Sequence, residues 1–283
     1  MIVSVGEVVW DTFLDRQVLG GAPVNVAYHL QCLGVEVDII TAVGNDELGR
    51  RTKERLRELN LPLAGVQTNE LPTGRVNVVM DSNRNHHFEI VAPAAWDAIS
   101  LDKAKAHLGD RAFHMLYGTL SQRDECSRVT LRSLWEMADK CFYDVNLRPP
   151  FTDCERVKES LKAADVVKMN NEELLVIAGW HNFTESDKKN AAGRLIEMYG
   201  LEVLVITEGP QGAWLTTGDK SVTVPGRPVE VEDTVGAGDA FFAAFLEGYL
   251  NGRDWQACLE KANRRGGYVA SRPGATPDMP PEI

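Results

Sequence analysis

The sequence of 283 residues is poor in cysteine, in positive charge and in long apolar runs. Its five cysteines are scattered and form no C-x-x-C pair, which argues against a disulfide framework and favours reduced thiols in the cytoplasm. Its 30 basic residues face 41 acidic ones, and the net charge of -11 argues against nucleic acid or an anionic membrane as a partner. No apolar run has the length of a membrane span, and "MIVSVGEVVW" at the N-terminus predicts a strand rather than a signal peptide.

What the chain does contain is an alternation of short apolar runs and longer amphipathic segments. The apolar runs are rich in Val and Ile and predict buried strands at 2–5, 37–42, 112–117, 141–145, 165–169 and 203–207. The amphipathic segments predict helices at 23–33, 46–59, 123–138, 155–163, 171–178 and 186–199. This order is typical of an α/β fold, in which a mostly parallel sheet carries helices on both faces.

Two stretches follow a different period. "EVVWDTFLDRQVLGG" and "TGRVNVVMDSNRNHHFEIVAP" alternate apolar and polar residues and contain polar clusters at Asp15-Arg16 and at 81–85. They predict hairpins of a small antiparallel sheet, either a flap beside an active site or a purely structural ribbon. In such a strand His86 and His87 point to opposite faces, so a shared metal ion is not expected.

The stretch "DTVGAGDAF" places an acid directly after two glycines and at the start of an apolar helix. Asp239 can be a simple helix cap, because Asp is favoured at helix N-termini. It can also be a catalytic carboxylate beside bare backbone amides that hold an anion, with the helix dipole favouring its ionised form. The spacing alone does not separate the two readings.

A second helix start of this type lies near the N-terminus. In "GGAPVNVAYHLQCLG", Gly20 and Gly21 precede Pro23, which suits a first helical turn, and Asn25 stands in that turn. A ligand can approach the glycine backbone there while the Asn25 amide binds its hydroxyl groups, although a capping role alone is also open. The two helix starts can therefore face one site.

Two other glycine patterns carry little weight. "GNDELGRRT" has the glycine spacing of a P-loop, but Arg50 replaces the lysine. "GAGDAF" has Phe241 in place of the third glycine of a dinucleotide-binding motif, so a dehydrogenase is disfavoured.

Together, "GGAPVNVAYHLQCLG" and "DTVGAGDAF" resemble the two signatures of the ribokinase (PfkB-type) carbohydrate kinases, in their expected order. The resemblance extends over nearly the whole chain, through "VGNDELG", "KMNNEE", "TEGPQG" and "KANRRGGYVASRPGAT", and "GEVVWD", "AWD" and "DVNLRPP" are most similar to bacterial fructokinases. It implies a ribokinase-like three-layer sandwich with a mostly parallel central sheet. It also implies a single kinase domain over 1–283, with a small antiparallel β lid formed from about 7–20 and 68–95.

The resemblance also implies roles for individual residues. The catalytic base is Asp239, and the amides that meet the moving phosphoryl group belong to Gly236, Ala237 and Gly238. The sugar-binding positions are Asp11, Gly20, Gly21 and Asn25. The N-x-x-E pair that organises Mg²⁺, largely through water, is Asn170 and Glu173. The nucleotide-binding positions for ATP are Thr207, Gly209, Gly212 and, at the adenine, Asn263.

Two further assignments rest on the residue types and on the resemblance together. Lys168 precedes Asn170 by two positions and is expected beside phosphate, with a solvated lysine at a strand end as the alternative. Arg148, like Arg75, can bind a substrate carboxylate, or it can belong to a "D-x-N-x-R" segment that does not discriminate among substrates. The resemblance also allows a monovalent cation (K⁺) near Asp233 and the loop Ser271 to Thr276, and a homodimer through the lid.

The expected activity is ATP-dependent phosphorylation of a primary hydroxyl of a small sugar, with fructose as the favoured acceptor. Alternatives within the enzyme class are 2-keto-3-deoxygluconate, ribose, tagatose and nucleosides. A regulator that binds sugar or nucleotide but has lost catalysis is the alternative outside it. Which carbon is phosphorylated, and how strict the choice of nucleotide is, do not follow from the sequence.

Overall fold

A computed structural model of the chain describes all residues except 14–15, 81–85 and 184–186. Within the described residues nine strands form one sheet in the order β13-β12-β11-β10-β9-β8-β1-β4-β5, and only β12 and β13 run antiparallel to their neighbours. The strands are β1 (Ile2–Val5), β4 (Val37–Gly44), β5 (Val66–Asn69), β8 (His114–Gly118), β9 (Lys140–Asp144), β10 (Val166–Asn170), β11 (Val203–Thr207), β12 (Gly212–Thr216) and β13 (Ser221–Pro225).

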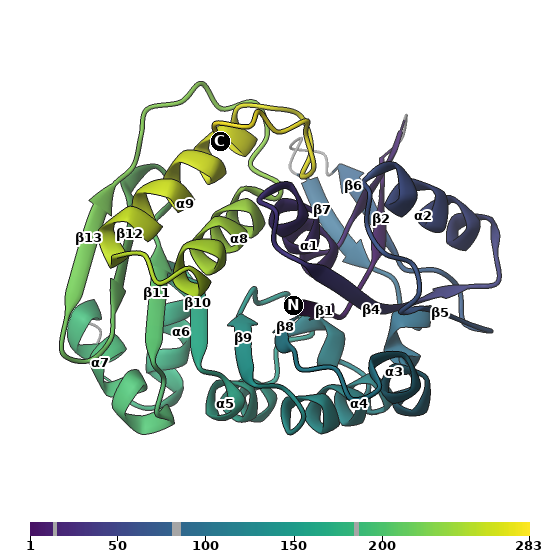
Figure 1. Cartoon of the computed structure of the whole chain (residues 1–283), viewed down its shortest axis with the longest axis horizontal. Coiled ribbons are helices and arrows are strands. Elements are labelled where there is room, and N and C mark those ends of the chain that lie inside the picture. Colours follow the sequence, from purple (N-terminus) through teal and green to yellow (C-terminus); the bar gives the residue numbers. More distant parts are fainter. Residues whose placement is uncertain (14–15, 81–85, 184–186) are drawn as a thin grey trace.

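Helices cover both faces of this sheet (Figure 1). One face packs against α3 (Leu101–Leu108), α4 (Glu125–Trp135), α5 (Cys154–Ala163), α6 (Asn171–Trp180) and α7 (Lys188–Tyr199). The other packs against α1 (Ala22–Cys32), α2 (Glu47–Glu58), α8 (Ala237–Leu250) and α9 (Trp255–Ala270). Successive strand residues enter opposite cores: Leu116 belongs to one apolar cluster, whereas Met115 and Tyr117 belong to the other. The predicted three-layer α/β fold is therefore confirmed.

A second, four-stranded sheet lies at one end of the molecule in the order β3-β2-β6-β7. Its strands are β2 (Val9–Thr12), β3 (Gln17–Gly20), β6 (Arg75–Met80) and β7 (His86–Ile90). Both hairpins are antiparallel as predicted, but β2 and β6 pair in parallel, which joins the two hairpins into one sheet. The turn residues 14–15 and 81–85 lie outside the described residues.

The small sheet starts later than the range 68–95 proposed from the sequence. Thr68 and Asn69 are the end of β5, which pairs with β4 of the main sheet. The small sheet has its own third strand only from Arg75 onward, and 95–98 form a short 3-10 helix against the main sheet. Local alternation did not mark the boundary, because β5 and β6 follow each other closely and belong to different sheets.

The P-loop-like stretch, residues 44–52, has a structural role in packing. Asp46 caps α2: its Oδ1 accepts hydrogen bonds from the N–H of Gly49 at 2.7 Å and from the hydroxyl of Thr73 at 2.6 Å. A Cβ on Gly49 would lie 2.2 Å from the carbonyl oxygen of Gly44, so glycine is required there by close backbone contact. The glycine spacing thus serves the junction between α2 and the segment that leads into β6.

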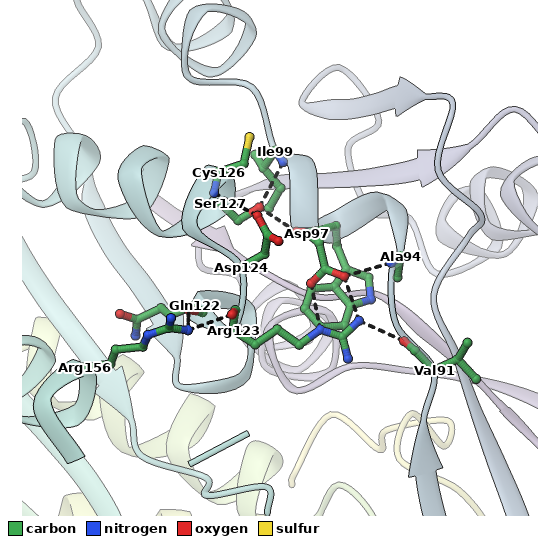
Figure 2. Close-up of polar contacts among 11 residues, drawn as sticks. Val91, Ala94, Asp97, Ile99, Gln122, Arg123, Asp124, Cys126, Ser127 and Arg156 are labelled. Atoms are coloured by element: carbon green, nitrogen blue, oxygen red, sulfur yellow. Dashed lines mark hydrogen bonds and ion pairs between the residues drawn. The ribbon is translucent and has the colours of Figure 1, made fainter. Parts of the chain in front are cut away.

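A buried ion pair joins the end of the small sheet to the start of α4 (Figure 2). Arg123 donates from Nε to Asp97 Oδ1 and from Nη2 to Asp97 Oδ2, both at 2.7 Å, and also to the carbonyl oxygen of Val91 at 2.8 Å. Its guanidinium lies 3.9 Å from the ring centre of Trp96 and 4.8 Å from that of Phe151. This cluster holds the chain segment that leaves β7 against the main domain.

Among the described residues, none of the helices combines the length and apolar character that a membrane crossing requires.

Replacing Arg123 with Met is expected to destabilise the protein by about 3–5 kcal/mol, because the buried Asp97 carboxylate would lose the one cation that pairs with it among the described residues. Urea unfolding followed by circular dichroism measures the effect. The double variant Asp97→Asn, Arg123→Met should recover part of the loss. Arg50→Met removes only exposed ion pairs and serves as the control, with an unfolding midpoint close to that of the unmodified protein. Equal midpoints for Arg123→Met and Arg50→Met would contradict the assignment.

Candidate active site

The two glycine-preceded helix starts meet. The side-chain amide Nδ2 of Asn25 in α1 donates a hydrogen bond of 2.8 Å to Oδ2 of Asp239 in α8, across 214 residues of sequence. The two helices lie side by side (Figure 1). The helices begin after Gly21, with φ of 113°, and after Gly236, with φ of 76°. The distant stretches that the sequence singled out are therefore parts of one site.

The site lies at the carboxyl edge of the parallel strands, where ligands bind in open α/β sheets. Asp144 is the last residue of β9, and Asn170 and Thr207 are paired last residues of β10 and β11. Lys168 stands opposite Asp144 in the sheet register. The sheet thus delivers polar side chains from three adjacent strands to the same edge.

The first turn of α8 presents backbone rather than side chains. Within the described chain the N–H groups of Gly236 and Gly238 donate to no protein acceptor, whereas that of Ala237 donates to the carbonyl oxygen of Thr234 at 3.3 Å. A Cβ on Gly238 would lie 3.2 Å from Nζ of Lys168. The helix N-terminus and a lysine ammonium therefore point to one place, which is suited to an anion.

Lys168 is buried and bound to a carboxylate, so the solvated alternative does not apply. Its Nζ lies 2.8 Å from Oδ1 and 3.1 Å from Oδ2 of Asp144. Burial alone would lower the pKa of Lys168, but the carboxylates of Asp144, Glu173 and Asp239 outweigh it and raise the pKa. The lysine is a permanent cation beside α8.

The pKa of Asp239 is raised to about 6, mainly by burial and next by the charge of Asp144, while Lys168, the hydrogen bond from Asn25 and Arg148 oppose the rise. The sequence had indicated that the helix N-terminus would favour the ionised form. Burial acts in the opposite direction and raises the pKa, because the carboxyl lies where the first turns of α1 and α8 meet. At neutral pH Asp239 is still mostly ionised and able to accept a proton.

The acceptor side is formed by β2, β3 and the turn into α1. A Cβ on Gly20 would lie 3.1 Å from Oδ2 of Asp11, and a Cβ on Gly21 would lie 2.5 Å from the carbonyl oxygen of Glu7. The pKa of Asp11 is raised to about 6 by burial, against the opposing charge of Arg148. Arg148 itself is exposed in the loop after β9. The acceptor side thus combines glycine backbone with acid groups.

Asn170 and Glu173 form a capping box at the start of α6. Oδ1 of Asn170 accepts from the N–H of Glu173 at 2.8 Å, and Oε2 of Glu173 accepts from the N–H of Asn170 at 2.7 Å. Oε1 of Glu173 accepts from the N–H of Leu147 at 2.8 Å. In the described residues no group of three or more His, Cys, Asp or Glu could hold a metal ion. Because the side-chain oxygens of Asn170 and Glu173 already accept hydrogen bonds, these two residues suit a hydrated Mg²⁺ held through water better than direct ligation of the metal.

The expected nucleotide positions fall into two groups. Thr207 ends β11 beside Asn170, whereas Gly212 and Asn263 both contact the end of β13. A Cβ on Gly212 would lie 2.3 Å from the carbonyl oxygen of Val224, and Nδ2 of Asn263 donates to that same oxygen at 3.3 Å. Gly209, with φ of 56°, has open space around it. Gly212 is thus required by the β12–β13 hairpin, whatever its role toward a nucleotide.

A segment after α9, residues 271–279, joins the two halves of the site. Ala275 packs against Gly236, where a Cβ would lie only 2.4 Å from its methyl group, and its carbonyl oxygen lies 2.9 Å from Nε2 of His29. Tyr28 donates to the carbonyl oxygen of Pro277 at 2.7 Å. Asp233 accepts from the N–H of Gly274 at 3.1 Å. The loop expected to hold a monovalent cation is thus adjacent to Asp233, and the cation itself stays a prediction.

Two acids of the site were not singled out from the sequence. Asp144 holds Lys168, and Glu7 is 3% exposed directly after β1. Asp144 ends one apolar strand run, and Glu7 follows another after Gly6. Both runs stop at the carboxyl edge of the sheet. An acid in that position is the signal that could have identified them.

Comparison with known proteins agrees with this geometry. The sequence matches the profile of the pfkB family carbohydrate kinases over residues 6–282, and the chain belongs to this family. The sugar kinase PH1459 of Pyrococcus horikoshii is 29% identical over 270 residues, which cover 88% of this chain and 83% of that protein. Its crystal structure in complex with ATP has a TM-score of 0.83 and covers 98% of this chain and 94% of that chain.

Two fructokinases are also similar. Fructokinase-2 of Zea mays is 27% identical, with 99% of this chain and 91% of that protein covered. A fructokinase of Vibrio cholerae, solved with fructose, ADP and calcium ion, has a TM-score of 0.83 at 23% identity and covers 97% of this chain and 94% of that chain. The protein is a sugar kinase, a phosphotransferase with an alcohol group as acceptor.

Gly236 and Gly252 offer a matched test of the α8 N-terminus. Both have positive φ, but only at Gly236 would a Cβ strike backbone, at 2.5 Å from Cα of Ala275; nothing lies within 4 Å of Gly252 at the other end of α8. Gly236→Ala should lower the melting temperature much more than Gly252→Ala does. The Gly252→Ala variant should lose only the free energy of left-handed backbone strain, about 1–2 kcal/mol. It should also weaken ATP binding, measured by calorimetry. Equal effects of the two variants on both measurements would contradict the role of the Gly236 turn.

Proposed function

We propose that this sugar kinase transfers the γ-phosphoryl group of ATP to a primary hydroxyl of a small neutral ketose, with fructose as the favoured acceptor. The observation that carries the proposal is the hydrogen bond from Asn25 to Asp239. It places a carboxylate between the acceptor turn of α1 and the anion-binding start of α8. The similarity to plant and bacterial fructokinases supports fructose.

In this mechanism Asp239 is the general base. The bond from Asn25 occupies Oδ2, so Oδ1 is left to take the proton of the sugar hydroxyl as it attacks phosphorus. The N–H groups of Gly236 and Gly238 and the ammonium of Lys168 meet the negative charge of the transferring group. Their positions are fixed before reaction by the helix start and by the ion pair with Asp144. Mg²⁺, held through water near Asn170 and Glu173, supplies charge neutralisation of the polyphosphate when bound.

The small sheet serves as a lid over the acceptor. Asp11 lies on β2 and Gly20 on β3, so two of the proposed sugar contacts belong to that sheet. A lid that brings its own substrate contacts closes only over bound sugar. Closure then excludes water, which competes with the sugar as a nucleophile.

A sugar acid such as 2-keto-3-deoxygluconate is the second candidate, because the exposed Arg148 forms no ion pair within 4 Å among the described residues. The positive charge of Arg148 nevertheless already interacts with three carboxyl groups, those of Glu7, Asp11 and Asp239. Acids outnumber the cation in this half of the site. A neutral acceptor fits that balance better than an anionic one.

ADP release measured over a panel of sugars tests the substrate. With Mg²⁺ and ATP, fructose is expected to give the highest kcat/KM, and omission of Mg²⁺ should abolish turnover. Faster turnover of 2-keto-3-deoxygluconate would assign the protein to the second candidate. Sugar binding without ADP release from any sugar would indicate a regulator that has lost catalysis.

Asp239→Asn should leave sugar and ATP binding nearly unchanged and lower kcat by roughly 10²–10⁴-fold. The unmodified enzyme needs ionised Asp239, so its kcat at saturating sugar should rise with pH through a pKa of about 6 and then level off. Stopped assays from pH 5 to pH 8 measure both effects. Asp254→Asn, which changes the capping acid of the neighbouring helix α9, is the control and should keep normal turnover. Normal turnover in Asp239→Asn would exclude Asp239 as the base.

A further inference from the structure

Glu7 is a buried acid that the mechanism above does not use. It follows β1, is 3% exposed, and its Oε2 is enclosed without a hydrogen-bond partner in the described part of the chain. An unpaired carboxyl in the interior is costly, and native proteins keep such groups mainly where a ligand or water completes them. Glu7 therefore requires a partner that the polypeptide does not supply.

Glu7 lies beside the glycine turn that is proposed to bind the acceptor. A Cβ on Gly21 would lie 2.5 Å from the carbonyl oxygen of Glu7, and a Cβ on Gly6 would lie 2.8 Å from Cγ of Pro23. Residues 6 and 7 thus pack directly against the glycine turn and the first turn of α1, which holds Asn25. The glycine at position 21 permits this close approach.

A second unpartnered atom lies in the first turn of α1, against which residues 6 and 7 pack. Asn25 is 4% exposed, and while its Nδ2 is bound to Asp239, its Oδ1 is enclosed and has no partner among the described residues. An amide oxygen can only accept a hydrogen bond, so the missing group there must be a donor. A substrate carboxylate or phosphate has no proton to donate, whereas a hydroxyl has.

We propose that Glu7 is a specificity-determining residue of the acceptor site, where its carboxyl and Oδ1 of Asn25 together bind hydroxyl groups of a neutral sugar. The proposal rests on the sugar kinase function above and narrows its substrate class. A hydroxyl can donate to Asn25 Oδ1 and accept from a protonated Glu7 carboxyl, which satisfies both buried groups. The ionised carboxylate of an acidic sugar has no proton to donate to Asn25 Oδ1.

The charged groups around Glu7 determine its protonation. Burial raises the pKa of Glu7 to about 7; its own backbone N–H and Arg148 oppose the rise, and the carboxylates of Asp239 and Asp144 add to it. These groups come from α8, from β9 and from the loop after β9. Below pH 7 the carboxyl is protonated and can donate to a sugar oxygen. Above pH 7 it is ionised, can only accept, and repels Asp239, so sugar affinity should fall.

Steady-state kinetics of three variants test the role of Glu7. Glu7→Ala should raise the KM for the sugar about 10-fold or more at pH 6, as expected for buried partners left unpaired, and leave the KM for ATP unchanged. Glu7→Gln keeps a donor and an acceptor, so its sugar KM should stay near that of the unmodified enzyme at pH 6. It should also lack the rise in sugar KM above pH 7 that the unmodified enzyme shows. The control is Glu247→Gln, a buried glutamate of α8 paired with Lys261, which should keep the normal pH dependence of sugar KM.

Each outcome decides the proposal. An unchanged sugar KM in Glu7→Ala, or a pH-dependent sugar KM retained in Glu7→Gln, overturns it. The increase in melting temperature caused by ATP shows whether each variant is folded; if Glu7→Ala is not, the pH profile of Glu7→Gln decides alone. An unmodified enzyme that phosphorylates no sugar overturns the proposed function together with the role of Glu7. An active enzyme with sugar KM insensitive to Glu7 overturns the role of Glu7 only.

Discussion

The hydrogen bond between Asn25 and Asp239 is the contact on which the rest of the site depends. It requires the first turns of α1 and α8 to meet at one edge of the sheet, and each turn is possible only because a glycine precedes it. The bond orients the carboxylate and counteracts the rise of its pKa. One contact therefore orients the proposed base and favours its ionised form.

The proposed site contains features that offset the negative charge of the protein. The chain carries a net charge of -11, and Glu7, Asp11, Asp144 and Asp239 add acid groups to the proposed site, which must also bind an anionic nucleotide. Asp144 is neutralised by Lys168, and burial raises the pKa of the other three. The anion is then met by backbone N–H groups and one lysine, while the acids lie toward the acceptor. The separation gives each half of the site its own chemistry.

The sequence predicted the layers of the fold because strands buried on both faces are nearly continuous apolar runs, and the bounds of β1 and β11 agree with the prediction. It left α3, α9, β5 and the β12–β13 hairpin without an assignment. β13 alternates exposed and half-buried residues at the sheet edge, so its local pattern is weak. The parallel pairing of β2 with β6 is a contact between distant segments, which periodicity does not encode.

In the site, too, local motifs were predictable from the sequence, whereas features that depend on assembly of the fold were not. Motifs identified Asp239 and Asn25, and the structure brings them together. Asp144 and Glu7 were missed because their environment arises only when strands and helices assemble, and burial raises the pKa of Glu7 to about 7. The helix dipole, inferred from sequence, predicted a readily ionised Asp239, whereas burial, which the sequence did not reveal, raises the pKa of Asp239 to about 6.

The segment 271–279 contacts Gly236 at one helix start and the side chains of Tyr28 and His29 in the other helix. It therefore connects two helices that also pack directly on each other. During synthesis, α1 emerges from the ribosome long before this segment does. The strands up to β11 can form early, but the contact between Tyr28 and Pro277 forms only after residue 277 has been translated.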